Sequence, residues 1–238
     1  MLDHGGPSRL YVTEMDEPPT EILTRPSGSF YDQDYYENGP ATGKSNYRDY
    51  RWLPDLTLPM ADWLKRLLHI KDGDTLLDVG CAKGFLVKAL RMRGVNAHGY
   101  DVSEWPVANC DPAVKGYLTT DASILNDRWD HIVCKDTLEH VEEKELALLL
   151  QRMIAAARKT VLIVVPLTHH VGGPYLRDED NSDPSHVIAW PMNRWMDFLH
   201  QHFHTDNGFL TGSYHYPGIK PASSVVPKSC GFFQFTRV

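Results

Sequence analysis

The feature that most restricts the fold of this sequence is a short apolar run followed by a turn of small residues and then a helical pattern. Residues 76–79 form the apolar run and are typical of a strand buried on both faces. The turn places Gly80, Ala82 and Gly84 at alternate positions, where the small side chains let the backbone approach a ligand closely. Residues 85–91 are predicted to be helical. Strand, loop and helix in this order predict an open α/β sheet, in which ligands bind outside the carboxyl ends of the strands.

The rest of the chain continues this alternation. Further strands are expected over 95–101, 115–120, 129–134 and 160–165, and helices over 59–68, 142–157 and 191–201, with Pro59 as a first helical residue. Two final strands are expected over 209–216 and 230–237. No helical pattern separates these two strands, so they must pair antiparallel if they are neighbours.

Together with the acid before it, the small-residue loop reads Asp78-x-Gly80-x-Ala82-x-Gly84. This stretch resembles the first motif of class I S-adenosylmethionine-dependent methyltransferases of the small-molecule type, acidic-x-Gly-x-Gly-x-Gly, with Ala82 in place of the middle glycine. A dinucleotide fingerprint needs a glycine where Phe85 stands, which argues against NAD. The resemblance implies an α/β, Rossmann-like fold: a seven-stranded, mostly parallel sheet with an antiparallel last strand and helices on both faces. It also implies S-adenosyl-L-methionine as the cofactor.

Acids at successive strand ends are the candidate cofactor ligands. Asp101 ends the second strand, where Rossmann-type sites place the acid that accepts both ribose hydroxyls. The resemblance implies that Val102 lies against the adenine, that Asp121 and the Ala122 amide bind its edge, and that Asp78 orients the ammonium group. The backbone around Gly80 and the residue Lys135 would line the remainder, so the predicted cofactor set is Asp78, Gly80, Ala82, Gly84, Asp101, Val102, Asp121, Ala122 and Lys135. Alternatively, each acid alone could be a helix cap or turn former.

Two histidines are the candidate catalytic residues. His140 lies in Asp136-Thr-Leu-Glu-His-Val141, which resembles the family's Leu-Glu-His stretch after the fourth strand, and its unperturbed pKa suits a general base. His186 ends Asp183-Pro-Ser-His186 in a long polar segment, with Asp183 as the group that would orient it. Either histidine could instead have a packing role. The same side chains could bind a metal, but no H-E-x-x-H or i,i+4 pair supports this, so no metal site is predicted. His200 and His204 are expected to be surface residues.

The chain is expected to divide into an N-terminal arm and aromatic-rich flap over 1–55 and a methyltransferase domain over 56–238. Phe30 to Trp52 holds the aromatic residues of this flap, which either closes over the cofactor or packs as a strap without touching a ligand.

Composition limits the partners. The formal net charge is −7 and no basic face is evident, so nucleic acid is not expected as a substrate. The four cysteines form no C-x-x-C pair, no secretory signal begins the chain, and no apolar run approaches the ~20 residues of a membrane span, which together predict a cytoplasmic protein. We therefore expect a methyltransferase that acts on an oxygen or nitrogen of a sugar, nucleotide-sugar or other small metabolite. The alternatives are a methyltransferase of nucleic acid or protein, a nicotinamide oxidoreductase and a non-catalytic Rossmann-like binding domain. The oligomeric state does not follow from the sequence.

Overall fold

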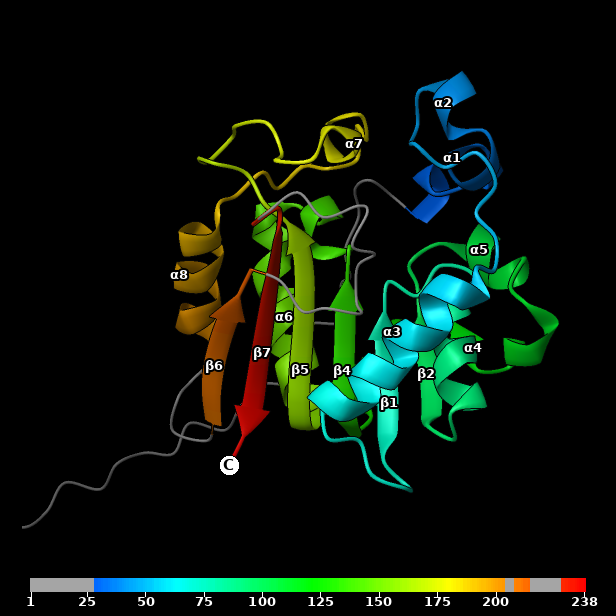
Figure 1. The fold of residues 1–238 in the computed structure, drawn as a ribbon, viewed down its shortest axis with the longest axis vertical. Coiled ribbons are helices and arrows are strands. Elements are labelled where there is room, and N and C mark those ends of the chain that lie inside the picture. The colour runs from blue at the N-terminus through cyan, green and yellow to red at the C-terminus, as the bar shows by residue number, and fades with distance from the viewer. Residues whose placement is uncertain (1–27, 204–207, 215–227) are drawn as a thin grey trace, which may run out of the picture.

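The described part of the chain, residues 28–203, 208–214 and 228–238 of a computed structural model, contains one seven-stranded sheet (Figure 1). The strand order is β3-β2-β1-β4-β5-β7-β6. The strands are β1 (Thr75–Val79), β2 (Asn96–Tyr100), β3 (Leu118–Thr119), β4 (Trp129–Lys135), β5 (Ala157–Pro166), β6 (Gly208–Ser213) and β7 (Cys230–Arg237). Strands β1 to β5 pair in parallel, whereas β7 is antiparallel to both β5 and β6. The expected mostly parallel sheet with an antiparallel last strand is confirmed.

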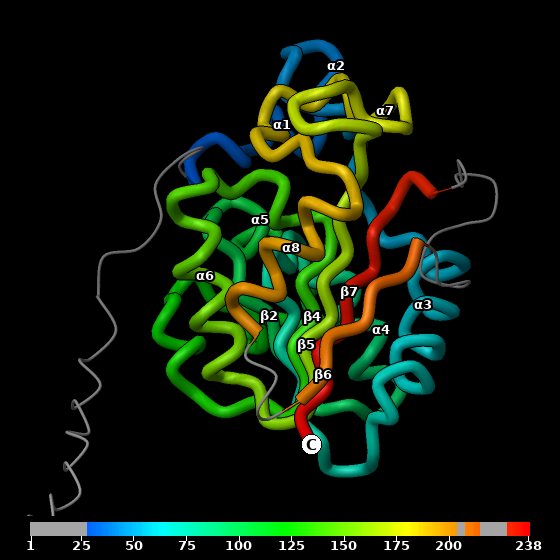
Figure 2. The backbone as a smooth tube through the Cα atoms, turned by 90° about the vertical axis from the view of Figure 1, so that its left-hand side faces the viewer, coloured from blue at the N-terminus to red at the C-terminus, as the bar shows by residue number. Residues whose placement is uncertain are grey.

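Helices cover both faces of this sheet, as Figure 2 shows edge-on. On one face α3 (Pro54–Leu67) and α4 (Phe85–Met92) bury stripes that include Leu64 and Leu90. On the other face α6 (Glu143–Ala156) and α8 (Met192–His202) bury stripes that include Leu150 and Trp195. The central strands lie between the two layers, and their near-continuous apolar sequences follow from burial on both sides.

Short elements connect the sheet and the long helices. They are α1 (Gln33–Glu37), α2 (Gly39–Thr42), α5 (Glu104–Ala108) and α7 (Asp178–Asn181), with 3₁₀ turns η1 (Gly28–Phe30), η2 (Pro112–Val114), η3 (Ala122–Asn126) and η4 (Leu138–His140). Figure 1 places α1, α2 and α7 at the end of the sheet to which the parallel strands point. Two segments far apart in sequence, 33–42 and 178–181, therefore lie around the edge where open α/β sheets bind ligands.

The prediction that a helix begins at Pro59 is wrong. Helix α3 begins at Pro54 and contains Pro59 in its interior. Proline is well suited to the first helical turn because the N–H that it lacks has no intrahelical acceptor there. A second proline one turn later is tolerated in this helix, which buries Met60 and Leu64 against the sheet layer.

Some expectations lie outside the described residues. They concern residues 1–27 of the N-terminal arm, the end of the predicted strand at 215–216, and His204. Among the described helices, none combines the length and the apolar character required to span a bilayer.

Candidate active site

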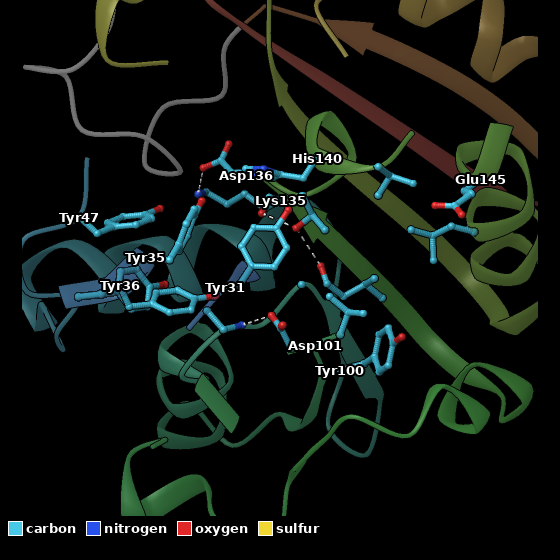
Figure 3. Close-up of a pocket in the computed structure, with 18 residues that line it drawn as sticks. Tyr31, Tyr35, Tyr36, Tyr47, Tyr100, Asp101, Lys135, Asp136, His140 and Glu145 are labelled. Carbon is cyan, nitrogen blue, oxygen red and sulfur yellow. Dashed lines mark hydrogen bonds and ion pairs between the residues drawn. The ribbon is translucent and has the colours of Figure 1, made fainter. Parts of the chain in front are cut away.

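A cavity of about 180 Å³ lies at the carboxyl ends of β1, β2 and β4 (Figure 3). Its walls come from the loop after β1, the residues that follow β2 and β4, the start of α6 and the tyrosine-rich segment 31–50. The predicted site residues that line it are Gly80, Ala82, Asp101, Val102, Lys135 and His140. The others, Asp78, Gly84, Asp121, Ala122 and His186, lie outside its lining.

The loop after β1 has a left-handed backbone at alternate residues, with φ of 80° at Gly80, 49° at Ala82 and 74° at Gly84. A Cβ atom on Gly80 would lie 2.1 Å from the Thr137 hydroxyl, so this position requires glycine. Ala82 adopts the left-handed conformation with a side chain, which costs about 1–2 kcal/mol. Gly84 is the N-cap residue of α4, and a Cβ atom there would lie 2.6 Å from the Leu118 side chain.

Asp101 connects this loop to the end of β2. Its carboxylate accepts hydrogen bonds from the Ala82 N–H at 2.8 Å and from the Ser103 N–H at 2.9 Å. Burial raises the pKa of this carboxyl, and the two backbone donors oppose the rise. Each carboxylate oxygen can accept a second hydrogen bond, so Asp101 can bind a pair of adjacent hydroxyls at the cavity wall while it holds the loop.

Asp78 lies beneath the loop and is 4% exposed. Among the described residues, no donor reaches its carboxylate within hydrogen-bonding distance. Burial raises the pKa of Asp78 to about 7, the positive charge of Lys135 opposes this rise, and Asp101 adds to it. Lys135 itself lines the cavity and pairs with Asp136 at 2.5 Å. A cation bound next to this buried carboxyl would stabilise its ionised form and lower its pKa.

Asp121 and Ala122 follow β3 at the same edge of the sheet. The Asp121 carboxylate is exposed and accepts from the Ser123 N–H at 2.8 Å, so it caps the η3 turn. Ala122 is buried, and its carbonyl accepts a hydrogen bond from Arg152. Their adenine contact stays a prediction, because both lie outside the cavity lining.

The aromatic segment packs over the cofactor loop. Tyr31, Tyr35 and Tyr36 form a buried cluster with Ala82, and the Tyr31 carbonyl accepts from the Ser103 hydroxyl at 2.8 Å. Burial raises the pKa of all three phenols, so they are neutral side chains near pH 7. The segment is therefore one wall of the cavity, as Figure 3 shows for Tyr31, Tyr35 and Tyr36.

A second cavity of about 220 Å³ adjoins the first. Four residues line both of them: Tyr35, Tyr47, Asp136 and His140. His186 lines only the second cavity and lies beside His140, with ring centroids 4.6 Å apart. The structure thus brings together the two predicted catalytic histidines, although 46 positions separate them.

A hydrogen-bonded chain fixes the His140 ring. Its Nδ1 lies 2.8 Å from the Ser185 hydroxyl, which donates its proton to the Asp183 carboxylate. His140 Nδ1 must then carry the hydrogen, which leaves the lone pair on Nε2. Burial, together with the neighbouring His186, lowers the pKa of His140 to about 4. The prediction that Asp183 orients His186 is wrong, since its carboxylate accepts from Ser185 and from the Tyr35 hydroxyl.

Three residues of this region received no role from the sequence. They are Tyr35, Glu139 and Ser185. Tyr35 and Glu139 line the second cavity, Tyr35 donates a hydrogen bond to Asp183, and Ser185 is hydrogen-bonded to His140. Glu139 and Ser185 each directly precede a predicted catalytic histidine, and this adjacency is a sequence signal that could have identified them.

Comparison with known proteins identifies a family. A family model described as a methyltransferase domain matches residues 52–209. A ubiquinone biosynthesis O-methyltransferase of Dechloromonas aromatica (strain RCB) is 29% identical over 103 residues, which are 39% of this chain and 44% of that protein. A probable fatty acid methyltransferase of Pseudomonas putida is 32% identical over 127 residues, 47% of this chain and 32% of that protein. The chain thus matches less than half the length of these curated relatives.

Solved structures show the same fold at low sequence identity. A SAM-dependent methyltransferase from Archaeoglobus fulgidus aligns with a TM-score of 0.55 at 14% identity, over 74% of this chain and 92% of that one. Magnesium protoporphyrin IX methyltransferase from Synechocystis PCC 6803, solved with bound SAM, aligns with a TM-score of 0.52 at 14% identity, over 76% of this chain and 79% of that one.

Proposed function

The chain belongs to the class I S-adenosylmethionine-dependent methyltransferase family, and we propose that it transfers a methyl group from S-adenosylmethionine to an oxygen or nitrogen of a small-molecule acceptor. The observation that supports this most is the pair of adjoining cavities at the carboxyl ends of the strands. One has the features of a nucleoside site, the other contains two histidines, and His140 lines both.

The residues that line the first cavity, and those just outside its lining, fit S-adenosylmethionine. Asp101 has free acceptor capacity for the ribose hydroxyls, Val102 lies next to it for the adenine, and the backbone of Gly80 lines the cavity. The buried Asp78 carboxyl would balance the charge of the ligand's ammonium group. When bound, S-adenosylmethionine supplies an electrophilic methyl group on a sulfonium. Ala82, Gly84, Lys135, Asp121 and Ala122 complete the proposed cofactor set, the last two as adenine contacts.

The second cavity is the proposed acceptor site. Its volume of about 220 Å³ and the tyrosine wall shared with the first cavity suit a small molecule rather than a polymer. Its lining includes five carboxylates, which would repel a phosphate backbone. One curated relative is named for O-methylation in ubiquinone biosynthesis, which supports a small acceptor.

His140 and His186 promote loss of the acceptor's proton. A hydroxyl or ammonium group must lose its proton to become a nucleophile, so a positioned group that assists this loss speeds the reaction. The Ser185–Asp183 chain keeps His140 in the tautomer whose Nε2 carries a lone pair.

Methyl-acceptor screening tests this function. We expect S-adenosylhomocysteine to bind in calorimetry, and labelled methyl groups to appear on a small molecule in a panel of phenols, sugars and amines. Turnover with RNA, DNA or protein alone would contradict the proposed acceptor class. Fluorescence titration with NADH is the control for an oxidoreductase, and lack of S-adenosylhomocysteine binding would indicate a non-catalytic domain.

We place this activity in the cytoplasm. Cys81 and Cys134 are buried thiols without a disulfide, as expected for a protein kept in a reducing compartment.

A further inference from the structure

Glu139, His140 and His186 form a compact group of metal-ligating side chains at the second cavity. One candidate ligand atom from each residue lies within 4.8 Å of those of the other two. The backbone carbonyl of Glu139 accepts hydrogen bonds from Val187 N at 2.8 Å and Ile188 N at 3.0 Å. The loop that carries His186 is therefore attached to the η4 turn that carries the other two residues, and the group is built into the fold.

Both imidazoles are oriented as in metal sites. His140 Nδ1 donates to the Ser185 hydroxyl, and His186 Nδ1 lies 2.8 Å from the Asp180 carbonyl, to which it can only donate. Each ring therefore keeps its Nε2 lone pair for another partner. Histidines that ligate metals nearly always donate their second ring N–H to a carbonyl, carboxylate or similar group, which fixes the ring and its tautomer.

The charge of the cavity also favours a cation. The carboxylates of its lining are Asp136, Glu139, Glu179, Asp180 and Asp183, and Arg177 is its one guanidinium. The Nε atom of Arg177 lies 3.6 Å from a Glu179 carboxylate oxygen and 3.9 Å from one of Asp180, so these two carboxylates offset its positive charge. Glu139 is 1% exposed, and a buried carboxylate is stabilised by coordination to a metal ion.

We propose that Glu139, His140 and His186 bind a divalent transition-metal ion that coordinates a hydroxyl group of the methyl acceptor. This deepens the proposed function and rests on it. Two imidazoles and one carboxylate suit Zn²⁺, Mn²⁺, Co²⁺ or Fe²⁺ better than Mg²⁺ or Ca²⁺, which prefer oxygen ligands. Bonds of about 2.0–2.2 Å to each ligand require the atoms to be roughly 3–4 Å apart, so a bound ion would draw the three side chains together from separations of up to 4.8 Å.

The ion would act as a Lewis acid on the acceptor. Three protein ligands leave coordination positions open, which the acceptor hydroxyl can enter. Coordination lowers the pKa of a bound hydroxyl, as it does for bound water. The O–H bond then breaks, its proton passes to a water molecule, and the electron pair stays on the oxygen. The sequence-based expectation of no metal depended on the lack of a helical ligand pair, whereas these ligands come from two segments.

Calorimetry with Zn²⁺ alone tests the site without any acceptor. The wild-type protein should bind one Zn²⁺, and His186→Ala and Glu139→Gln should each weaken binding at least tenfold. Ser185→Ala, which removes only the partner of His140, should weaken it about 10- to 100-fold. His200→Ala, an exposed histidine on α8, is the matched control and should bind as the wild type does. Lack of Zn²⁺ binding by the wild type, or equal binding by His186→Ala, would overturn the proposal.

Two further measurements separate this site from the proposed function. Circular dichroism will show whether Glu139→Gln folds. If it does not, the visible d–d absorption of Co²⁺ bound to the wild type and to His186→Ala tests the site instead. Tetrahedral or five-coordinate Co²⁺ with nitrogen ligands gives visible bands, and His186→Ala must lose them. S-Adenosylhomocysteine affinity should be the same before and after chelation. Zn²⁺ binding without any methyl transfer would contradict the proposed function and leave the metal site in place. Methyl transfer that continues in excess chelator would contradict the metal site and leave the proposed function in place.

Discussion

The Asp101 carboxylate accepts a hydrogen bond from the backbone N–H of Ala82 at 2.8 Å, so the end of β2 fixes the loop that follows β1. The same carboxylate accepts from Ser103 N, and Asp101 is 6% exposed. One buried acid therefore both shapes the loop and presents acceptors to the first cavity. The cost of the left-handed Ala82 is offset in part by this charge-assisted hydrogen bond.

Asp101→Asn should weaken S-adenosylhomocysteine binding. The amide has one acceptor oxygen in place of two, and its NH₂ group would face a backbone N–H. Loss of one charged hydrogen bond corresponds to about 1.5–3 kcal/mol, or roughly 10- to 150-fold in affinity. Calorimetry measures the change, and Asp127→Asn, an exposed aspartate outside the cavity lining, is the control. Equal affinities for wild type and Asp101→Asn would show that the ribose does not bind here.

Cofactor affinity should depend on pH through Asp78. Its carboxyl has a pKa of about 7 because of burial, and a bound ammonium group favours the ionised form. Affinity should therefore fall by about tenfold between pH 8 and pH 6, as the Asp78 carboxyl takes up a proton. Asp78→Asn should bind more weakly at pH 8 and lose this dependence. A variant that keeps the wild-type slope would assign the titration to another group.

Much of the fold could be predicted because its signals are local. Strands β1, β4 and β7 were predicted within about two residues, since each is a dense apolar run bounded by polar residues or turns. The antiparallel pairing of β6 and β7 followed from the lack of a helical sequence pattern between them. The start of α3 was missed because two prolines compete for the role of first helical residue, and spacing alone does not decide between Pro54 and Pro59.

The candidate site was less accessible because its contacts join distant segments. The Tyr35 hydroxyl donates to Asp183 across 148 positions, and no local pattern in a single sequence indicates that pair. Asp183 was expected to orient the nearby His186, whereas the loop turns its carboxylate toward Ser185 and thereby toward His140. Residue types predicted which side chains could act, but the tertiary packing determines which of them act together.

Tyr35→Phe should loosen the tyrosine wall. The Tyr35 hydroxyl donates to Asp183 at 2.7 Å, while the ring packs against Tyr31 with centroids 4.9 Å apart. Phenylalanine keeps the ring contact and removes the hydrogen bond to a charged group, worth about 1.5–3 kcal/mol. Amide hydrogen exchange in residues 31–50 should be about tenfold faster or more, and the KM for the acceptor should rise. Tyr214→Phe, an exposed tyrosine, should leave both unchanged. Unaltered exchange in Tyr35→Phe would mean that packing alone holds the segment.

Asp74→Asn should destabilise the fold in a pH-dependent way without affecting the site. Asp74 is buried at the opposite edge of the sheet from the cavities, where it accepts hydrogen bonds from Lys159 at 2.5 Å and from the Lys71 N–H at 3.0 Å, and lies 3.0 Å from His131 Nε2. Burial alone would raise the pKa of this carboxyl, but these partners hold it well below its usual range.

Because the folded-state pKa of Asp74 is depressed, its contribution is present above the unfolded-state pKa of about 3.9 and disappears as pH falls through the lower folded-state value. We expect Asp74→Asn to lower the free energy of unfolding at pH 7 by about 1.5–3 kcal/mol. The lower end of this range is expected, because solvent screens the ion pair with the half-exposed Lys159. Urea unfolding at pH 7 and pH 3 should show a smaller gap between the two proteins at pH 3. S-Adenosylhomocysteine affinity at pH 7 should be unchanged, since the cofactor cavity is formed by the other ends of the strands. A gap of equal size at both pH values would mean that the carboxylate charge is not what stabilises this edge.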